Sequence, residues 1–152
     1  FKRETSIWTT LDHPNITPFY GWALEVDFEL HPCIVSQYCP NLSASSYLSE
    51  NPNANRTKIV YEAAEGLSYL HSREVIHGDI KPRNVLINAH HVAMLCDFGL
   101  AMALSDQATI PQGSSRYSTI DYTAPELCVA TEPGLRTRES DVWSLGCTGM
   151  EV

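Results

Sequence analysis

A short run of unlike polar residues lies between two apolar segments near the middle of the chain. It restricts the possible fold more than any other feature. Residues 75–87 read VIHGDIKPRNVLI, and the stretch from Asp79 to Asn84 contains three charged side chains and one amide. The β-prone segment 85–87 follows at once. Side chains of such different chemistry can work as one site when they lie close together beside a buried strand. A site of this kind needs its groups in fixed positions, so we expect a rigid framework to hold this loop.

A second acidic position follows further along the chain. Asp97 comes thirteen residues after Asn84, just after the apolar segment 92–95, and Gly99 permits a sharp turn behind it. A carboxylate and an amide oxygen that converge from two strand ends suit Mg²⁺, which prefers oxygen ligands. Asp79 can then accept a proton from a substrate hydroxyl, and Lys81 can neutralise phosphate charge. A single aspartate on a loop is more often a cap or turn residue, so the prediction rests on the set.

The composition narrows the class of protein. The 152 residues are about enough for one domain, and 43% of them are apolar. Ten Lys and Arg face eighteen Asp and Glu, and the net charge of -8 argues against nucleic acid as the main partner. No apolar run approaches the roughly 18 residues of a membrane span. We expect an intracellular, cytoplasmic protein, with a nuclear location or membrane tethering through other regions left open.

The cysteines and the two ends of the chain support further expectations. The five cysteines are an odd number without a Cys-x-x-Cys pair, which favours free thiols in a reducing compartment over a disulfide framework or a zinc ribbon. The first residues, FKRETSIW, resemble the middle of a helix, and the last, WSLGCTGMEV, stop inside an apolar pattern. We therefore expect part of a larger domain.

Local patterns predict an alternation of strands and helices. Ile59, Ala63, Leu67 and Leu70 recur at helical spacing, and Asn53 or Asn55 can cap a helix that ends near residues 71–72. The other predicted elements are a helix end at 1–10, a turn at 11–16, strands within 17–24 and 31–39 joined by the acidic stretch 25–27, a short helix at 43–49, strands at 85–87 and 92–95, an aperiodic loop at 100–121, and a last helix from Thr137 or Ser140.

Four motifs occur in a fixed order. They are H-x-D-x-K-x-x-N at 77–84, D-F-G at 97–99, A-P-E at 124–126 and D-V-W-S-L-G at 141–146. This series, and with it nearly the whole chain, resembles the protein kinase family. The resemblance implies a partial α+β fold of the protein kinase type. Residues 1–36 would be the end of the N-lobe, 37–41 the hinge, and 42–152 part of the mainly helical C-lobe.

The resemblance also implies roles for the polar residues of the central motifs. Asp79 looks like the catalytic base, and Lys81 would contact the transferred phosphate. Asn84 and Asp97 look like the Mg²⁺ ligands. The protein would use ATP and Mg²⁺ to phosphorylate Ser or Thr hydroxyls of protein substrates. The alternative is a pseudokinase, or a truncated kinase-like binding module without activity.

A supporting framework is implied in the same way. His77 and Phe98 would stack in an internal hydrophobic column that marks the active state, continued by Trp8 and Phe19. Asp141 would hydrogen-bond the backbone of the catalytic loop. In the substrate-binding region, Thr119 fits a Ser/Thr kinase, and Glu126 would pair with an arginine beyond the end of this chain.

The nucleotide site is implied less specifically. Glu4 would pair with the ATP-binding lysine, although a surface glutamate is the alternative. Ser36 would be the gatekeeper, and the backbone from Gln37 to Cys39 would meet adenine above Leu86, although a plain buried strand is also compatible. Cys96 would lie near the nucleotide or be a buried, inert thiol.

The chain departs from the family at three places. It contains neither a G-x-G-x-x-G loop nor the ATP-binding lysine, and we expect both upstream. Gly78 stands where the family usually has an arginine that binds an activation-loop phosphate, so activity is predicted not to need that phosphate unless Arg116 or another cation replaces the contact. Ser118 and Thr119 replace the usual Gly-Thr pair. The stretches HPNI, SYLHS and IVSQYC look most like the tyrosine-kinase-like group of Ser/Thr kinases.

Overall fold

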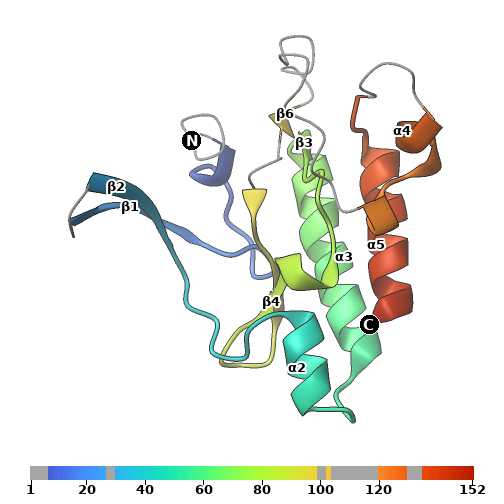
Figure 1. The fold of residues 1–152 in the computed structure, drawn as a ribbon, viewed down its shortest axis with the longest axis horizontal. Coiled ribbons are helices and arrows are strands. Elements are labelled where there is room, and N and C mark those ends of the chain that lie inside the picture. The colour runs from blue at the N-terminus through green and yellow to red at the C-terminus, as the bar shows by residue number, and fades with distance from the viewer. Residues whose placement is uncertain (1–6, 27–29, 99–101, 104–119, 130–134) are drawn as a thin grey trace.

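The structure is a computed structural model, which describes residues 7–26, 30–98, 102–103, 120–129 and 135–152 (Figure 1). The helices are α2 (Ala44–Glu50), α3 (Arg56–Ser72), α4 (Pro125–Val129) and α5 (Arg138–Glu151), with 3-10 turns η1 (Pro82–Asn84) and η4 (Ile120–Tyr122). The strands are β1 (Phe19–Val26), β2 (Leu30–Ser36), β3 (Val75–Ile76), β4 (Val85–Ile87), β5 (Ala93–Leu95) and β6 (Met102–Ala103).

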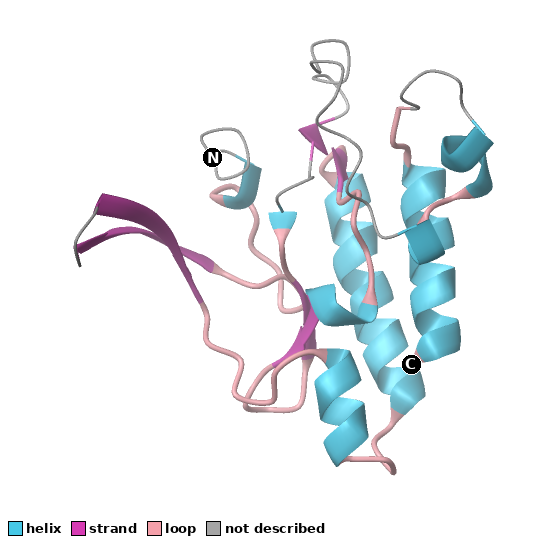
Figure 2. Ribbon diagram, viewed as in Figure 1, coloured by secondary structure: helices cyan, strands magenta, loops and turns pink. Residues whose placement is uncertain are grey.

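The strands form three antiparallel pairs: β1 with β2, β3 with β6, and β4 with β5. The β1–β2 hairpin extends away from the helices, whereas α3 and α5 lie side by side (Figure 2). The β4–β5 hairpin packs on α3. The mixed α+β fold predicted from the sequence is therefore confirmed.

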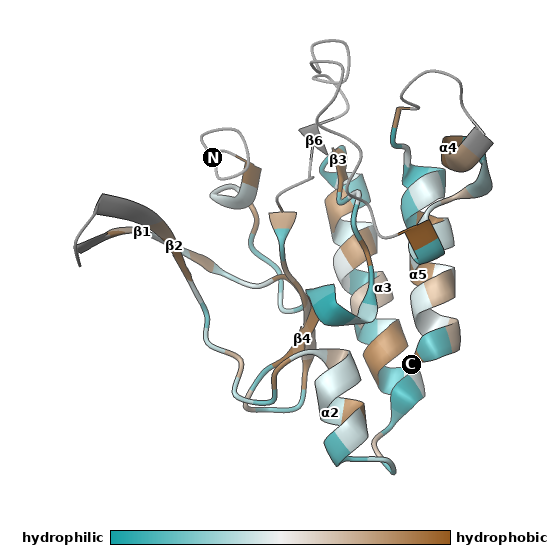
Figure 3. Cartoon of the chain, viewed as in Figure 1, coloured by the Kyte–Doolittle hydropathy of each residue, from teal (hydrophilic) through white to brown (hydrophobic). Residues whose placement is uncertain are grey.

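The helices begin where their capping residues predict. Asn55 caps α3 by accepting a hydrogen bond from the Lys58 backbone N–H at 3.0 Å. Thr137 and Ser140 form a reciprocal capping box at the start of α5. Apolar residues recur along α3 (Figure 3), and its buried positions include Ile59, Ala63, Leu67 and Leu70. Local signals thus fixed these helices correctly.

Two strand predictions were wrong. Glu25 and Val26 were expected to connect the first two strands, but they belong to β1 and pair with His31 and Leu30. Backbone pairing across the hairpin overrides the weak strand preference of glutamate. Residues 102–103, expected within an aperiodic loop, pair with β3 as strand β6. These outcomes depend on a partner strand, which a local pattern does not contain.

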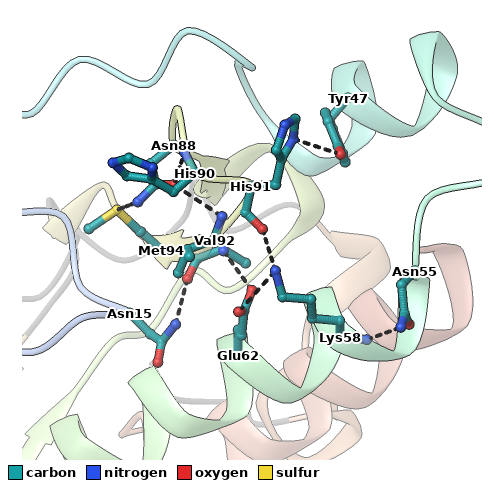
Figure 4. A network of polar contacts seen from close by, with 11 residues as sticks. Asn15, Tyr47, Asn55, Lys58, Glu62, Asn88, His90, His91, Val92 and Met94 are labelled. Carbon is teal, nitrogen blue, oxygen red and sulfur yellow. Dashed lines mark hydrogen bonds and ion pairs between the residues drawn. The ribbon is translucent and has the colours of Figure 1, made fainter.

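A polar network attaches the β4–β5 hairpin to α3 (Figure 4). One Glu62 carboxylate oxygen accepts a hydrogen bond from the Ala93 N–H at 2.8 Å, and the Asn15 side chain donates to the Ala93 carbonyl at 2.9 Å. Lys58 donates to the His91 carbonyl at 2.7 Å. The hairpin is thereby held rigidly on the helix, and its opposite end carries the polar loop.

Candidate active site

The polar loop between β3 and β4 brings three predicted side chains into direct contact. The ammonium of Lys81 lies 2.7 Å from one carboxylate oxygen of Asp79. The Asn84 amide nitrogen donates to the same oxygen at 3.0 Å and to the Asp79 backbone carbonyl at 2.8 Å. Asn84 ends the 3-10 turn η1 and is buried, so it lies on regular structure and not on an open loop. These contacts fix the orientation of the Asp79 carboxylate.

Asp97 lies at the same end of the β4–β5 hairpin as Asn84. The Cys96 N–H donates to the Asn84 carbonyl at 2.9 Å, which continues the pairing one step beyond Val85 and Leu95. Asp97 is exposed and has a left-handed backbone with φ of 62°. Non-glycine residues in this region cost about 1–3 kcal/mol and cluster at functional sites. Gly99, which was expected to make the turn, lies outside the described residues.

A buried carboxylate from α5 anchors the start of the polar loop. Asp141, 1% exposed, accepts hydrogen bonds from the backbone N–H groups of His77 at 2.9 Å and Gly78 at 2.8 Å. The His71 ring lies 3.0 Å from the same carboxylate. Asp141 therefore makes the backbone contact that the sequence predicted for it.

His77 is fully buried and held in one tautomer. Its Nδ1 accepts a hydrogen bond from the Asp79 N–H at 3.2 Å, so Nε2 carries the proton and donates to the Cys96 carbonyl at 3.0 Å. Burial lowers the pKa of His77 below its ordinary value, although the negative charge of Asp141 opposes this. A neutral His77 thus connects the loop to the strand end that leads to Asp97.

The aromatic side chains predicted to stack do lie together. The ring centroids of His77 and Phe98 are 5.4 Å apart, and those of Phe98 and Trp8 are 5.1 Å apart. Trp8 lies 5.5 Å from Phe19. Phe98 is completely buried. Aromatic pairs at these separations add to apolar burial, so the column stabilises the segment next to Asp97.

The predicted hinge lines a pocket of about 480 Å³. The pocket is lined by Ile34, Val35, Ser36, Gln37, Tyr38, Cys39, Leu42, Ser43 and Leu86. This volume suits a small organic ligand, and the polar backbone of the hinge borders it. A second pocket, about 560 Å³, lies between the start of α3 and the end of α5, away from these residues, and we assign it no part in the site.

Burial favours the protonated form of both thiols in this region. Burial raises the pKa of Cys39. Burial, followed by the negative charge of Asp97, raises the pKa of Cys96 to about 12. Of the two interpretations of Cys96, the inert thiol is the one that this chemistry supports.

Several predicted residues are placed elsewhere or fall outside the described ranges. Glu4 and Thr119 lie outside them. Glu126 lies in the first turn of α4 and is exposed, and its expected pairing with an arginine stays a prediction. Within the described ranges, no helix is long and apolar enough to cross a membrane, and no three His, Cys, Asp or Glu side chains gather as a metal site.

Sequence reasoning missed two residues of the site. His71 lies in the last turn of α3 and reaches Asp141, but in the sequence it is only a residue near the end of a helical pattern. Arg136 comes just before the cap of α5 and is 5% exposed. Nothing in the surrounding turn residues distinguishes it from an ordinary surface arginine.

Comparisons with known proteins agree with the motif series. Residues 1–152 match the family described as protein kinase domain. The chain is 34% identical over 148 residues to the serine/threonine-protein kinase RUNKEL of Arabidopsis thaliana, covering 95% of this chain and 10% of that protein. It is 32% identical over 158 residues to an Aurora kinase of Eremothecium gossypii, covering 100% of this chain and 40% of that protein.

A further relative comes from a slime mould. The mitogen-activated protein kinase kinase kinase A of Dictyostelium discoideum is 35% identical over 158 residues, covering 100% of this chain and 16% of that protein. The chain therefore spans less than half the length of each of these relatives. These relatives carry different kinase names, so the assignment of this chain to the tyrosine-kinase-like group stays a prediction.

Proposed function

The chain belongs to the protein kinase domain family, and from that premise we propose that it forms the catalytic centre of a protein Ser/Thr kinase. The observation that carries the proposal is the convergence of Asp79, Lys81 and Asn84 at the end of a hairpin that also carries Asp97. Names of similar proteins support the acceptor class, since RUNKEL is described as a serine/threonine-protein kinase. Phosphorylation of protein Ser or Thr from ATP is the proposed reaction.

In this proposal Asp79 takes the proton of the substrate hydroxyl as the new bond to phosphorus forms. Asn84 donates one hydrogen bond to the Asp79 carboxylate and a second to the Asp79 backbone carbonyl, and the Asp79 N–H donates to His77, so the carboxylate is oriented. Lys81, at 2.7 Å from Asp79, places a positive charge where the transferred phosphoryl group would be negative. Positioning and charge are what phosphoryl transfer requires from a protein.

The residues present also fit Mg²⁺. Because the Asn84 nitrogen is used by Asp79, its amide oxygen is the atom suited to a cation, and the exposed Asp97 carboxylate is a second oxygen donor. Mg²⁺ commonly takes only one or two protein carboxylates, together with water and substrate phosphates. When bound, it would offset the negative charge of the phosphates.

The nucleotide is proposed to bind at the hinge pocket. Ser36, Gln37, Cys39 and Leu86 all line it, as the resemblance implies for an adenine site. Glu4 is proposed to pair with a lysine upstream of this chain, and Thr119 to contact the substrate. We also propose that residues 1–152 are the central part of a longer kinase domain, because the sequence contains no phosphate-covering glycine loop. An intracellular location stays a prediction.

Substitution of the two aspartates in the full-length kinase tests the proposal. Asp79→Asn should lower the rate of phosphate transfer by at least about 10²-fold, because a positioned acid–base group alone contributes about 10²–10⁴-fold. Asp97→Asn should also lower the rate strongly, because it removes the carboxylate proposed to hold Mg²⁺. Their melting temperatures should stay near that of the unsubstituted protein. Asp12→Asn, at an exposed loop position, is the matched control. Near-normal turnover by either variant would reject the assignment, and an inactive unsubstituted kinase would favour the pseudokinase.

A further inference from the structure

A buried arginine lies just before α5, the helix whose first turn carries the carboxylate that anchors the polar loop. Arg136 comes directly before Thr137, which caps that helix, and is 5% exposed. The same end of α5 carries Asp141, whose carboxylate holds the His77 and Gly78 N–H groups. Arginine is rarely buried this deeply unless negative charges offset the loss of water.

Two carboxylates supply that negative charge. Burial lowers the pKa of Arg136, and the negative charges of Asp79 and Asp141 act against this. The guanidinium stays charged in proteins, so it lies permanently within the field of both carboxylates. Asp141 is itself almost completely buried, and a buried carboxylate interacts favourably with a nearby cation.

The loop lacks an arginine of its own at the adjacent position. Residue 78 is a glycine with φ of 78°, a left-handed conformation that glycine adopts without strain and that larger residues rarely adopt. The loop backbone can therefore hold this shape at low cost, while the positive charge comes from α5.

We propose that Arg136 is a positioning residue for the catalytic loop, acting as a permanent counter-charge to Asp141 and Asp79 in place of an arginine at position 78. It touches no substrate in this scheme. It keeps Asp141 bonded to the loop backbone, and so keeps the Asp79 carboxylate correctly oriented. The inference rests on the kinase activity proposed above.

The test compares Arg136→Gln and Arg136→Lys with Arg138→Gln in the full-length kinase after phosphatase treatment. Arg138 lies two residues further along, in the first turn of α5, and is exposed, so its substitution removes the same charge close by. Arg136→Gln should lower kcat by about 10- to 100-fold with little change in KM for ATP, since a small misplacement of a catalytic group has effects of this size. Arg136→Lys should recover most of kcat, and Arg138→Gln should match the unsubstituted enzyme.

Amide hydrogen exchange supplies a readout that does not depend on activity. The N–H groups of His77 and Gly78 should exchange faster in Arg136→Gln than in Arg138→Gln, while α3 stays protected. If the unsubstituted protein is inactive but this difference is found, the proposed activity fails and the positioning role stands. Equal kcat and equal exchange in the two glutamine variants would overturn the role. So would a loss of kcat confined to enzyme that has not been dephosphorylated, because Arg136 would then be a phosphate receptor.

Discussion

His77 shows how one buried side chain can couple the site to pH. It has a hydrogen-bond partner on each ring nitrogen and no exposure to water. Only the neutral form can accept from the Asp79 N–H and donate to the Cys96 carbonyl at once. A protonated ring would lose the first of these bonds and place a charge in a buried position.

The resulting prediction concerns the acid side of the stability curve. Burial lowers the pKa of folded His77 below the ordinary 6.5, so the unfolded chain binds more protons as pH falls through that value. The contribution of neutral His77 to the free energy of unfolding is therefore fully present above about pH 6.5. Below that pH the contribution falls, by at most about 1.4 kcal/mol per pH unit. His77→Gln, which cannot titrate, should be less stable than the unsubstituted protein at pH 7.5.

Denaturant unfolding of both proteins from pH 7.5 to pH 5.5 measures this effect. The gap in unfolding free energy between the two should narrow as the pH falls, because other titrating groups are common to both. A gap that stays constant over this range would show that His77 is not neutral in the folded protein.

At the scale of elements, the contact between α3 and the loop before β1 is unusually close. A Cβ atom added at Gly66 would lie 2.6 Å from the Asn15 carbonyl oxygen and 3.3 Å from a Leu95 methyl carbon. The Asn15 backbone in turn accepts a hydrogen bond from the Leu95 N–H at 2.9 Å. Position 66 therefore admits no side chain unless the loop moves away from the hairpin.

Gly66→Ala should consequently destabilise the protein, by about 1–3 kcal/mol, the usual range for overpacking. Helix preference alone predicts the opposite sign, a gain of about 0.5–1 kcal/mol. Thermal unfolding of the full-length kinase decides between them. Ser68→Ala, on the exposed side of the same helix, is the control and should change stability by about 0.5 kcal/mol or less. A higher melting temperature for Gly66→Ala would contradict the close-contact argument.

At the scale of the whole molecule, α5 and its surroundings leave large apolar side chains in water. Met150 is 90% exposed, and Val142, Trp143, Leu135 and Ile120 are also exposed. Large exposed apolar surfaces in a soluble chain commonly mark interfaces or aggregation sites. In our proposal the remainder of a longer kinase domain covers this surface.

Residues 1–152 expressed alone should therefore aggregate and transfer no phosphate. The sequence provides no glycine-rich loop to cover a triphosphate and no lysine partner for Glu4 in the motif that the family uses. Light scattering on the purified chain checks the predicted aggregation. ATP-binding and phosphate-transfer assays check the predicted lack of activity. A monomeric, active preparation of these residues would contradict it and would show that the proposed longer domain is not required.

The sequence alone determined the features that depend on neighbouring residues. Helix α3 follows from its apolar periodicity and its capping residue Asn55. The start of α5 follows from its capping residue Thr137. Both caps act within three positions of themselves. The fixed order of motifs identified Asp79, Asn84 and Asp97 as one set. Spacing could do this because each residue lies next to an apolar strand whose end fixes its place.

Tertiary structure decided the contacts between distant parts of the chain. The hydrogen bonds that the His77 and Gly78 N–H groups donate to Asp141 join residues 64 and 63 positions apart. The sequence suggested these contacts only through family resemblance. The burial of Arg136 had no local sign, since its environment consists of carboxylates brought in by the loop and by α5. A local pattern records how a segment can fold, whereas burial and charge balance depend on which segments meet.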